Sequence, residues 1–188
     1  WNLIMQSPTL KNYMQAMGNI DSQIIKKANA VDLLIFDVDG VLTDGGIYIS
    51  ENGEESKRFF AQDGHGIKIL QSINVEIAIL SGRYSKSVEV RGKELGIKFI
   101  IQNSKDKYSD FKKNFMDKYK PENVCFVGDD IVDINLMKDA GLSITVPGAN
   151  YNDVRKHADW ITPRLGGFGA ARDVCDLIYY AKKKNGPE

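Results

Sequence analysis

Residues 33–41 read LLIFDVDGV, in which two carboxylates, Asp37 and Asp39, directly follow a run of four apolar residues. A wholly apolar run of this kind is typical of a strand inside a parallel sheet, where both faces are covered. Because residues two apart in an extended chain point to the same side, we expect Asp37 and Asp39 to face one site while Val38 packs inward. Two carboxylates this close to a core need a compensating charge, since burial penalises an unpaired charge and like charges repel.

Short β-type runs alternate with amphipathic stretches along the rest of the chain. This order predicts an α/β fold, a Rossmann-like parallel sheet with helices on both faces. Strands are expected at 32–37, 75–80, 99–102, 124–127, 142–146 and 159–162, and helices at 66–72, 86–95, 107–118, 131–138, 152–157 and 170–183. No linker or internal repeat divides the chain, so we expect one domain over residues 1–188, with a helical lead-in at 1–30 and a C-terminal tail at 166–188.

One segment interrupts the alternation just after the first strand. Asn52-Gly53 lies between the β-type runs IYIS and KRFF, and Asn-Gly between two such runs is a strong hairpin signal. The hairpin and one helix fill the chain between the first two strands of the sheet, and a single helix fills the chain between the third and fourth. The sequence therefore predicts a small β-hairpin insertion and no cap domain.

Composition excludes several classes of function. Lys and Arg together number 25, as do Asp and Glu, so no overall positive field favours nucleic acid. The apolar stretches are too short to cross a bilayer, and the first residues show no signal-peptide pattern, so no membrane partner is expected. Cys125 and Cys175 both lie in apolar settings and are expected to be free thiols in the core, which fits a reducing, cytoplasmic compartment.

Polar residues follow four of the predicted strands, where ligands of open α/β sheets bind. They are Asp37 and Asp39 after the first strand, Ser81-Gly82-Arg83 after the second, residues 104–107 after the third, and Asp129-Asp130 after the fourth. Three carboxylates at close quarters, those of Asp37, Asp39 and Asp129, require a cation. Oxygen ligands without His or Cys favour a hard ion, most simply Mg²⁺.

The other residues of this edge suit a phosphoryl group. Ser81 supplies a hydroxyl, the backbone N–H groups of a helix start favour phosphate, and a lysine, Lys105 or Lys107, supplies positive charge. The sequence has no Walker-type loop and no nucleophilic triad, so an aspartate is the candidate nucleophile. Asp37, at the strand tip, is the first choice, and Asp39 is then the group to protonate the leaving alcohol and later to activate water.

Each motif alone has a plainer interpretation. Aspartates are common in helix caps and turns. The segment DDIVD (129–133) alone also resembles the Asp-rich metal motif of prenyl-transferring enzymes, which place two such motifs on an all-helical fold. The joint pattern of four strand ends in the right order is far more specific than any of its parts.

The motifs DVDGVLTDG (37–45), SGR (81–83) and GDDIVD (128–133), with a lysine after the third strand, resemble the haloacid dehalogenase superfamily of phosphotransferases. The resemblance runs from residue 32 to about residue 178. It is strongest to the family of phosphatases that act on 3-deoxy-D-manno-octulosonate 8-phosphate (KDO 8-phosphate). The segments that narrow it to this family are DGGIYISENGEE (44–55), DGHGI (63–67), VEVRGKELGI (88–97), PENVCFVGDDIVD (121–133) and GGFGAARDVCDLI (166–178).

The resemblance implies a role for each matching position. Asp37 matches the nucleophile, which is also a Mg²⁺ ligand. Asp39 matches the general acid/base, whose backbone carbonyl also binds the metal, and Asp129 matches the remaining carboxylate ligand. Ser81 and Gly82 match the positions that bind phosphate.

Three further positions are less well determined. Lys107 is preferred to Lys105 as the catalytic lysine, because the family's spacing from this lysine to a phenylalanine four places on matches Phe111. Asp130 is included among the candidate metal ligands. Asp130 and Asp133 could equally orient other groups or begin a helix, where the dipole favours acidic residues.

Two arginines are candidates for the substrate. A sugar acid carries a carboxylate as well as a phosphate, and arginine is the bidentate partner of carboxylates. Arg83 follows the Ser-Gly pair, and Arg91 lies two turns along the same helix. The competing interpretation is that they lie on a solvated helix face.

The resemblance implies an enzyme, a Mg²⁺-dependent phosphomonoesterase that releases phosphate from KDO 8-phosphate through an aspartyl-phosphate intermediate, in lipopolysaccharide biosynthesis. Its partner is then a small sugar-acid phosphate. Three alternatives remain: a phosphatase for a sugar acid of the sialic acid 9-phosphate type, a capless phosphatase for a macromolecule, and a non-catalytic assembly module.

A site without a cap needs another cover, because phosphoryl transfer benefits from the exclusion of water. The resemblance implies a homotetramer in which hairpins form a barrel and neighbouring subunits complete each site. Gly166, Gly167 and Gly169 form either a flexible loop that reaches a neighbouring site, where Arg164 or Arg172 would meet an anion, or a plain surface turn.

Overall fold

The apolar run Leu33–Phe36 forms β1, and all four of its residues are buried. The computed structural model describes residues 20–149 and 152–184, and in these residues β1 lies inside a six-stranded sheet of order β5-β4-β1-β6-β7-β8. All the strand pairs of this sheet are parallel. The other strands are β4 (Glu76–Leu80), β5 (Phe99–Ile101), β6 (Val124–Val127), β7 (Leu142–Thr145) and β8 (Trp160–Ile161).

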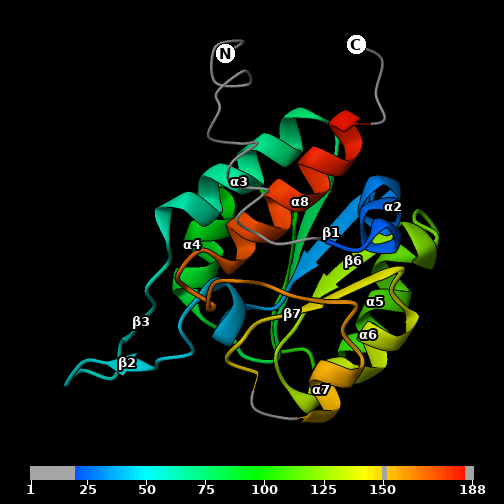
Figure 1. Cartoon of the computed structure of the whole chain (residues 1–188). Helices are drawn as coiled ribbons and strands as arrows, with labels where there is room; N and C mark the ends of the chain where they lie inside the picture. The colour runs from blue at the N-terminus through cyan, green and yellow to red at the C-terminus, as the bar shows by residue number, and fades with distance from the viewer. Residues whose placement is uncertain (1–19, 150–151, 185–188) are drawn as a thin grey trace, which may run out of the picture.

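Helices cover both faces of the sheet (Figure 1). Alternate β1 residues supply the two cores, Leu34 and Phe36 on one face and Leu33 and Ile35 on the other, as the two-residue period of a strand requires. The first core is closed by α2 (Ser22–Ala30), α3 (Ala61–Ser72), α4 (Lys86–Glu94) and α8 (Ala170–Lys184). The second is closed by α5 (Lys107–Phe115), α6 (Ile134–Asp139) and α7 (Asn152–Lys156). The predicted fold class is confirmed.

A two-stranded hairpin projects from the body of the domain between β1 and α3 (Figure 1). It pairs β2 (Tyr48–Ile49) with β3 (Glu55–Ser56) in antiparallel register, and Gly53 takes a φ of +79° in its turn. The predicted hairpin is confirmed, but the expectation of a strand over 57–60 is wrong. The returning chain leaves the ladder at Lys57, whose side chain is buried against the body of the protein.

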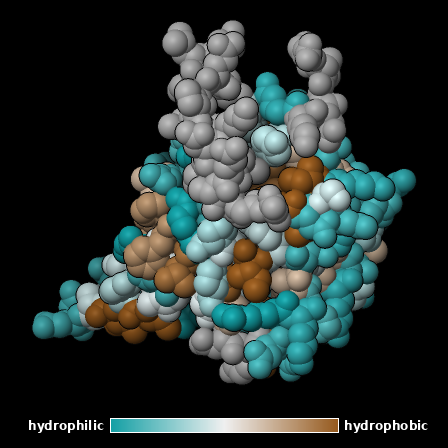
Figure 2. Space-filling view, viewed as in Figure 1, coloured by the Kyte–Doolittle hydropathy of each residue, from teal (hydrophilic) through white to brown (hydrophobic). Residues whose placement is uncertain are grey.

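The hairpin exposes apolar side chains. Ile47, Tyr48 and Ile49 are 47%, 49% and 67% exposed, and Figure 2 shows a hydrophobic patch on the projecting arm. A set of neighbouring exposed apolar side chains such as this one typically marks an interaction surface.

Most predicted elements are confirmed to within one to three residues at each end. The clearest difference is α3, which begins at Ala61 rather than at residue 66. Its early turns contain Gly64 and Gly66, which weaken the helical signal. Both glycines sit where a Cβ would meet a side chain of α4 or α8 at 2.8 Å or closer, so close packing explains them.

The predicted lead-in at 1–30 is described only from residue 20, and α2 forms its last part. Its earlier residues, like 185–188 of the predicted tail, lie outside the described residues. Between β1 and β4 the structure contains only the β1 loop (residues 37–45), the hairpin and α3, so the predicted absence of a cap at this point is confirmed. Within residues 20–149 and 152–184, no helix has the length and apolar character needed to cross a membrane.

Candidate active site

The four polar strand ends meet at one edge of the sheet. In the parallel register Phe36 of β1 is paired with Ile79 of β4 and with Val127 of β6. Asp37 therefore emerges between these two strands, and its backbone N–H donates to the Val127 carbonyl at 2.9 Å. Strand order alone brings together the residues that follow β1, β4, β5 and β6.

Lys107 is the cation at the centre of this edge. Its Nζ lies 2.9 Å from Asp37 Oδ1 and 2.6 Å from Asp133 Oδ1, and its side chain is only 4% exposed. It occupies the first position of α5, whose N-terminus is capped by the Asp106 carboxylate. Lys105, by contrast, is exposed. Of the two candidate lysines, the structure brings Lys107 to the nucleophile candidate.

Three carboxylates surround this lysine. Asp37, Asp129 and Asp133 each offer an oxygen, and these oxygens all lie within 4.8 Å of one another. Burial raises the pKa of Asp37 to about 7, even though Lys107 opposes the shift, and Asp133 adds to it. Burial, with the charges of Asp37 and Asp133, also raises the pKa of Asp129 to about 7. When they are ionised, these carboxylates carry more negative charge than Lys107 can balance. A bound cation would supply the missing positive charge.

The lysine itself stays protonated. Burial alone would lower the pKa of Lys107, but the adjacent Asp37 and Asp133 outweigh burial and raise it above its ordinary value. One lysine cannot balance three carboxylates, so a further positive charge is needed when all three are ionised.

Asp133 is a buried positioning group, which the sequence left as one of two interpretations. Its Oδ2 accepts the backbone N–H groups of Asp129 and Asp130, at 3.0 and 3.1 Å, while its Oδ1 faces Lys107. Both oxygens are therefore engaged by protein donors. Its place three residues after Asp130, which begins a helical turn, was the available signal, because a side chain at that position can accept the backbone N–H of the residue that begins the turn.

A divalent cation fits between Asp37 and Asp129. All the candidate donors are carboxylate oxygens, which suit a hard ion such as Mg²⁺. The β1 loop leaves room for the Asp129 carboxylate only because residue 40 is glycine. A Cβ at Gly40 would lie 2.1 Å from Asp129 Oδ2, and Gly40 has a φ of +86°, which other residues rarely adopt.

Asp39 lies outside this cluster, where Asp133 stands in place of the Asp39 carboxylate expected from the sequence, and the Asp39 side chain contacts a second set of charges. Its Oδ1 lies 2.5 Å from Lys57 Nζ, and its Oδ2 lies 3.7 Å from Arg83 Nε. Glu55 of β3 pairs with both cations, at 3.3 Å from Lys57 and 2.6 Å from Arg83. These four residues are called the charge ring below. The sequence reading missed Lys57 and Glu55.

Of the predicted site residues, Ser81 lies at the site edge and Asp130 does not join the carboxylate cluster. Ser81 is buried after β4, and its Oγ accepts the backbone N–H of Arg83, so the Ser-Gly-Arg turn is held at the site edge. Asp130, in contrast, caps its own helical turn through Ile131 N–H and is exposed. The structure does not bring Asp130 into the carboxylate cluster.

Arg91 also lies away from the cluster in this chain. It pairs with Glu94 on its own helix at 2.8 Å. Its guanidinium packs over Gly64 of α3, where a Cβ would lie 2.4 Å from Arg91 Nη2. The second turn of α4 faces the neighbouring helix at this point, so a residue on that turn does not reach the carboxylate cluster of the same subunit.

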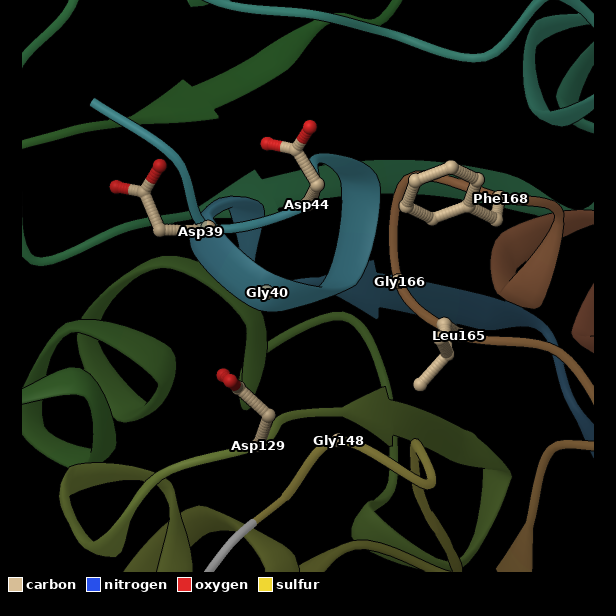
Figure 3. Close-up of a pocket in the computed structure, with 9 residues that line it drawn as sticks. Asp39, Gly40, Asp44, Asp129, Gly148, Leu165, Gly166 and Phe168 are labelled. Atoms are coloured by element: carbon tan, nitrogen blue, oxygen red, sulfur yellow. The ribbon is translucent and has the colours of Figure 1, made fainter. Parts of the chain in front are cut away.

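A cavity of about 370 Å³ opens beside the carboxylates (Figure 3). Asp39 and Asp44 of the β1 loop stand on one side, Asp129 and Gly148 on another, and Leu165, Gly166 and Phe168 close a third. A cavity of this size accommodates a small ligand.

The glycine segment (residues 164–169) forms one wall of this cavity. The Gly167 N–H donates to the Val41 carbonyl at 3.1 Å, and a Cβ at Gly166 would collide with the Gly40 carbonyl. Arg164 pairs with Asp173 at the start of α8. In this structure the segment lies against the β1 loop of its own chain.

A family model described as haloacid dehalogenase-like hydrolase matches residues 63–141. This stretch includes the strand ends after β4, β5 and β6 but begins after the β1 loop. Curated relatives extend the match over most of the chain. The chain is similar to the 3-deoxy-D-manno-octulosonate 8-phosphate phosphatases KdsC of Escherichia coli (strain K12) and Salmonella typhi, each 43% identical over 169 residues, which cover 89% of both chains.

Solved structures agree with this similarity. The chain resembles the 3-deoxy-D-manno-octulosonate 8-phosphate phosphatase from Yersinia pestis with a TM-score of 0.84 and 38% identity, covering 90% of this chain and 91% of that one. It also resembles the enzyme of that name from Moraxella catarrhalis, whose structure is a complex with magnesium ion, phosphate ion and KDO. That match has a TM-score of 0.81 and 38% identity, and it covers 86% of this chain and 93% of that one.

Proposed function

This chain belongs to the haloacid dehalogenase-like hydrolases, and on that premise we propose that it is a Mg²⁺-dependent phosphatase that hydrolyses KDO 8-phosphate to KDO and phosphate through an aspartyl-phosphate intermediate. The observation that carries the proposal is the contact between the buried Asp37 carboxylate and Lys107, next to Asp129, at the carboxyl ends of parallel strands. The protein is a phosphomonoesterase, in agreement with the relatives, which match 89% of its length and are named as phosphatases.

The reaction follows from the positions of these groups. An Asp37 oxygen attacks phosphorus, and the bond from phosphorus to the sugar oxygen breaks. Asp39 gives its proton to that leaving oxygen. In the second half, Asp39 takes a proton from water as the water attacks the phosphorus of the aspartyl phosphate, which frees Asp37. Lys107 offsets the negative charge of the nucleophile and of the phosphoryl oxygens, and Ser81 and the Gly82 backbone hold those oxygens.

Mg²⁺, when bound, supplies positive charge to the phosphoryl oxygens and to the carboxylates of Asp37 and Asp129. The carboxylate of Asp129 and that of Asp37 would hold it, with the Asp39 backbone carbonyl as a third donor. Support comes from the pKa of both carboxyl groups, which burial raises, because a bound cation would favour their ionised forms. The Moraxella catarrhalis structure, which includes a magnesium ion, supports the same choice of metal.

A sugar acid suits the outer part of the site. Its carboxylate needs a cation, and Arg83, whose side chain is about half exposed, supplies a guanidinium at the site edge. Arg91 is retained as a candidate only for an assembly in which it reaches another subunit's site. Because two of the relatives are named for KDO 8-phosphate, that ester is the expected substrate.

A substrate panel tests the proposal. Values of kcat/KM are compared for KDO 8-phosphate, a sialic acid 9-phosphate and simple sugar phosphates, with Mg²⁺ and with EDTA. We expect a strong preference for KDO 8-phosphate that EDTA abolishes. A preference for the sialic acid 9-phosphate would refute the proposed substrate but leave the proposed mechanism in place. If no phosphate were released from any ester, a non-catalytic assembly module would be favoured.

The proposed setting is lipopolysaccharide biosynthesis in the cytoplasm, where two buried free thiols, Cys125 and Cys175, stay reduced. A homotetramer joined through the hairpins would cover a site that has no cap. The exposed Ile47, Tyr48 and Ile49 support this assembly, since a monomer rarely leaves such a group in water.

A further inference from the structure

Lys57 is an unusual lysine, because its side chain is only 1% exposed although it follows a hairpin that projects into solvent. Lysine is rarely buried without a partner, since its ammonium group loses hydration. Its Nζ is compensated by two carboxylates, Asp39 at 2.5 Å and Glu55 at 3.3 Å. The buried stem and the two partners fix the position of the ammonium group.

The fixed Lys57 ammonium group restricts the orientation of the Asp39 carboxylate. It is the general acid/base of the proposed reaction, yet its side chain is 24% exposed and stands clear of the Asp37, Asp129 and Asp133 cluster. Without a partner it would sample several rotamers. Proton transfer requires the carboxyl group to be within hydrogen-bond reach of the reacting oxygen, so free rotation would cost rate.

From this arrangement we infer that Lys57 is a positioning residue for the proton-transfer steps, because it holds the Asp39 carboxylate in one orientation. The inference rests on the proposed function. Glu55 joins the two cations that contact Asp39, because it pairs with both Lys57 and Arg83. Arg83 in turn lies 3.7 Å from the second Asp39 oxygen. The charge ring alternates in sign and contains two cations and two anions, so it orients Asp39 without adding net charge.

The geometry also argues against a purely structural role for Lys57. Arg83 pairs with Glu55 Oε2 at 2.6 Å, and Lys57 faces the other oxygen, Oε1, only at 3.3 Å, beyond the 2.5 Å of its contact with Asp39. The shorter of its two contacts is to Asp39, which belongs to a different segment, 18 residues earlier in the chain. An isolated hairpin stem would not require a lysine whose ammonium group reaches across to the β1 loop.

The test separates proton transfer from the other parts of the reaction. Release of KDO needs a proton on the leaving alkoxide, whereas p-nitrophenolate leaves without one. The two substrates are KDO 8-phosphate and p-nitrophenyl phosphate. Release of the leaving group from each is measured in a single turnover, with enzyme in excess, for wild type, Lys57→Met, Lys57→Arg and Glu55→Gln. Lys98→Met is the matched control, because Lys98 is 73% exposed and pairs with Glu76 in a surface ion pair.

We expect Lys57→Met to slow KDO release by about 10- to 100-fold, within the range of general acid catalysis, and to slow p-nitrophenolate release by less than about threefold. Lys57→Arg should recover much of the loss, Glu55→Gln should show a smaller loss of the same selectivity, and Lys98→Met should match wild type. An equal loss on both esters would overturn the inference, and so would a faster release of KDO.

The outcomes also distinguish the inference from the proposed function. If wild type released p-nitrophenolate but not KDO, the proposed substrate would be wrong, and the best alkyl phosphate of the panel would replace KDO 8-phosphate in the comparison. If wild type acted on no ester, both would be refuted. If Lys57→Met failed to fold, Glu55→Gln would still give the substrate comparison, and an equal loss on KDO 8-phosphate and p-nitrophenyl phosphate in that variant would overturn the inference.

Discussion

Replacement of Asp133 by asparagine should destabilise the protein far more than the loss of a surface aspartate. Asp133 is fully buried, accepts two backbone N–H groups through Oδ2, and faces Lys107 through Oδ1 at 2.6 Å. An asparagine cannot replace all of these contacts. If its amide oxygen accepts the two N–H groups, its NH₂ group faces the Lys107 ammonium, and the flipped amide instead points NH₂ at the two backbone donors.

The expected cost follows from these contacts. Removing one partner of a buried ion pair costs about 3–5 kcal/mol. The change also relieves the repulsion of Asp133 with Asp37 and Asp129, so the lower end, about 3 kcal/mol, is the expected loss in free energy of unfolding. With a urea m-value of about 2 kcal/mol/M, the unfolding midpoint should fall by about 1.5 M.

The assay is urea unfolding followed by circular dichroism in EDTA, so that metal binding does not contribute. The control is Asp153→Asn, because Asp153 pairs with Lys156 at 3.3 Å and both side chains are about 70% exposed. Such a surface pair contributes about 1 kcal/mol at most. If Asp133→Asn shifted the midpoint no more than Asp153→Asn does, the role given to Asp133 as the buried anchor of the site would be refuted.

Three further outcomes are expected. Lys107→Met should lower kcat by about 100-fold or more while Lys105→Met leaves it near wild type, because of these two lysines Lys107 contacts Asp37, the proposed nucleophile; similar values in a steady-state assay would contradict this. Because burial raises the pKa of Asp37 and Asp129 from 3.8 to about 7, the folded metal-free protein binds more protons than the unfolded chain between these values. Its free energy of unfolding in EDTA should therefore fall as the pH rises from about 4 to about 7, and fall less in saturating Mg²⁺; urea midpoints that rise over this range in EDTA would argue against the assignment. Ile49→Glu should shift a tetramer to smaller species in sedimentation velocity, since Ile49 is 67% exposed on the hairpin, and an unchanged mass would place the contact elsewhere.

Much of the site edge could be predicted from local sequence. The run LLIF is apolar at every position because β1 is covered on both faces, and the strand ends are polar because they lie at the edge where the sheet meets solvent. The strand-helix alternation makes the sheet parallel, so all these ends point to one side. Asp37, Ser81 and Asp129 therefore follow from position and residue type, without knowledge of any side-chain contact, whereas position alone leaves Lys105 and Lys107 as alternatives.

The remaining assignments depend on contacts that the sequence does not encode locally. Asp130 and Asp133 are chemically alike, and only the turn after Asp130 decides which of them points inward to Lys107. Lys57 reaches Asp39 because the chain returns from the hairpin, and a local reading of KRFF predicts a strand instead. Arg91 faces Gly64 because two helices pack together, which no spacing within α4 reveals.

The central claim is that Asp37 is the nucleophile of a Mg²⁺-dependent phosphatase for KDO 8-phosphate. The most direct measurement is phosphate release from KDO 8-phosphate by wild type and by Asp37→Asn, each with Mg²⁺ and with EDTA, after circular dichroism has shown that both are folded. The account predicts release by the wild type with Mg²⁺ only, and none by Asp37→Asn. Release by Asp37→Asn at a rate near that of wild type, or release that persists in EDTA, would contradict it.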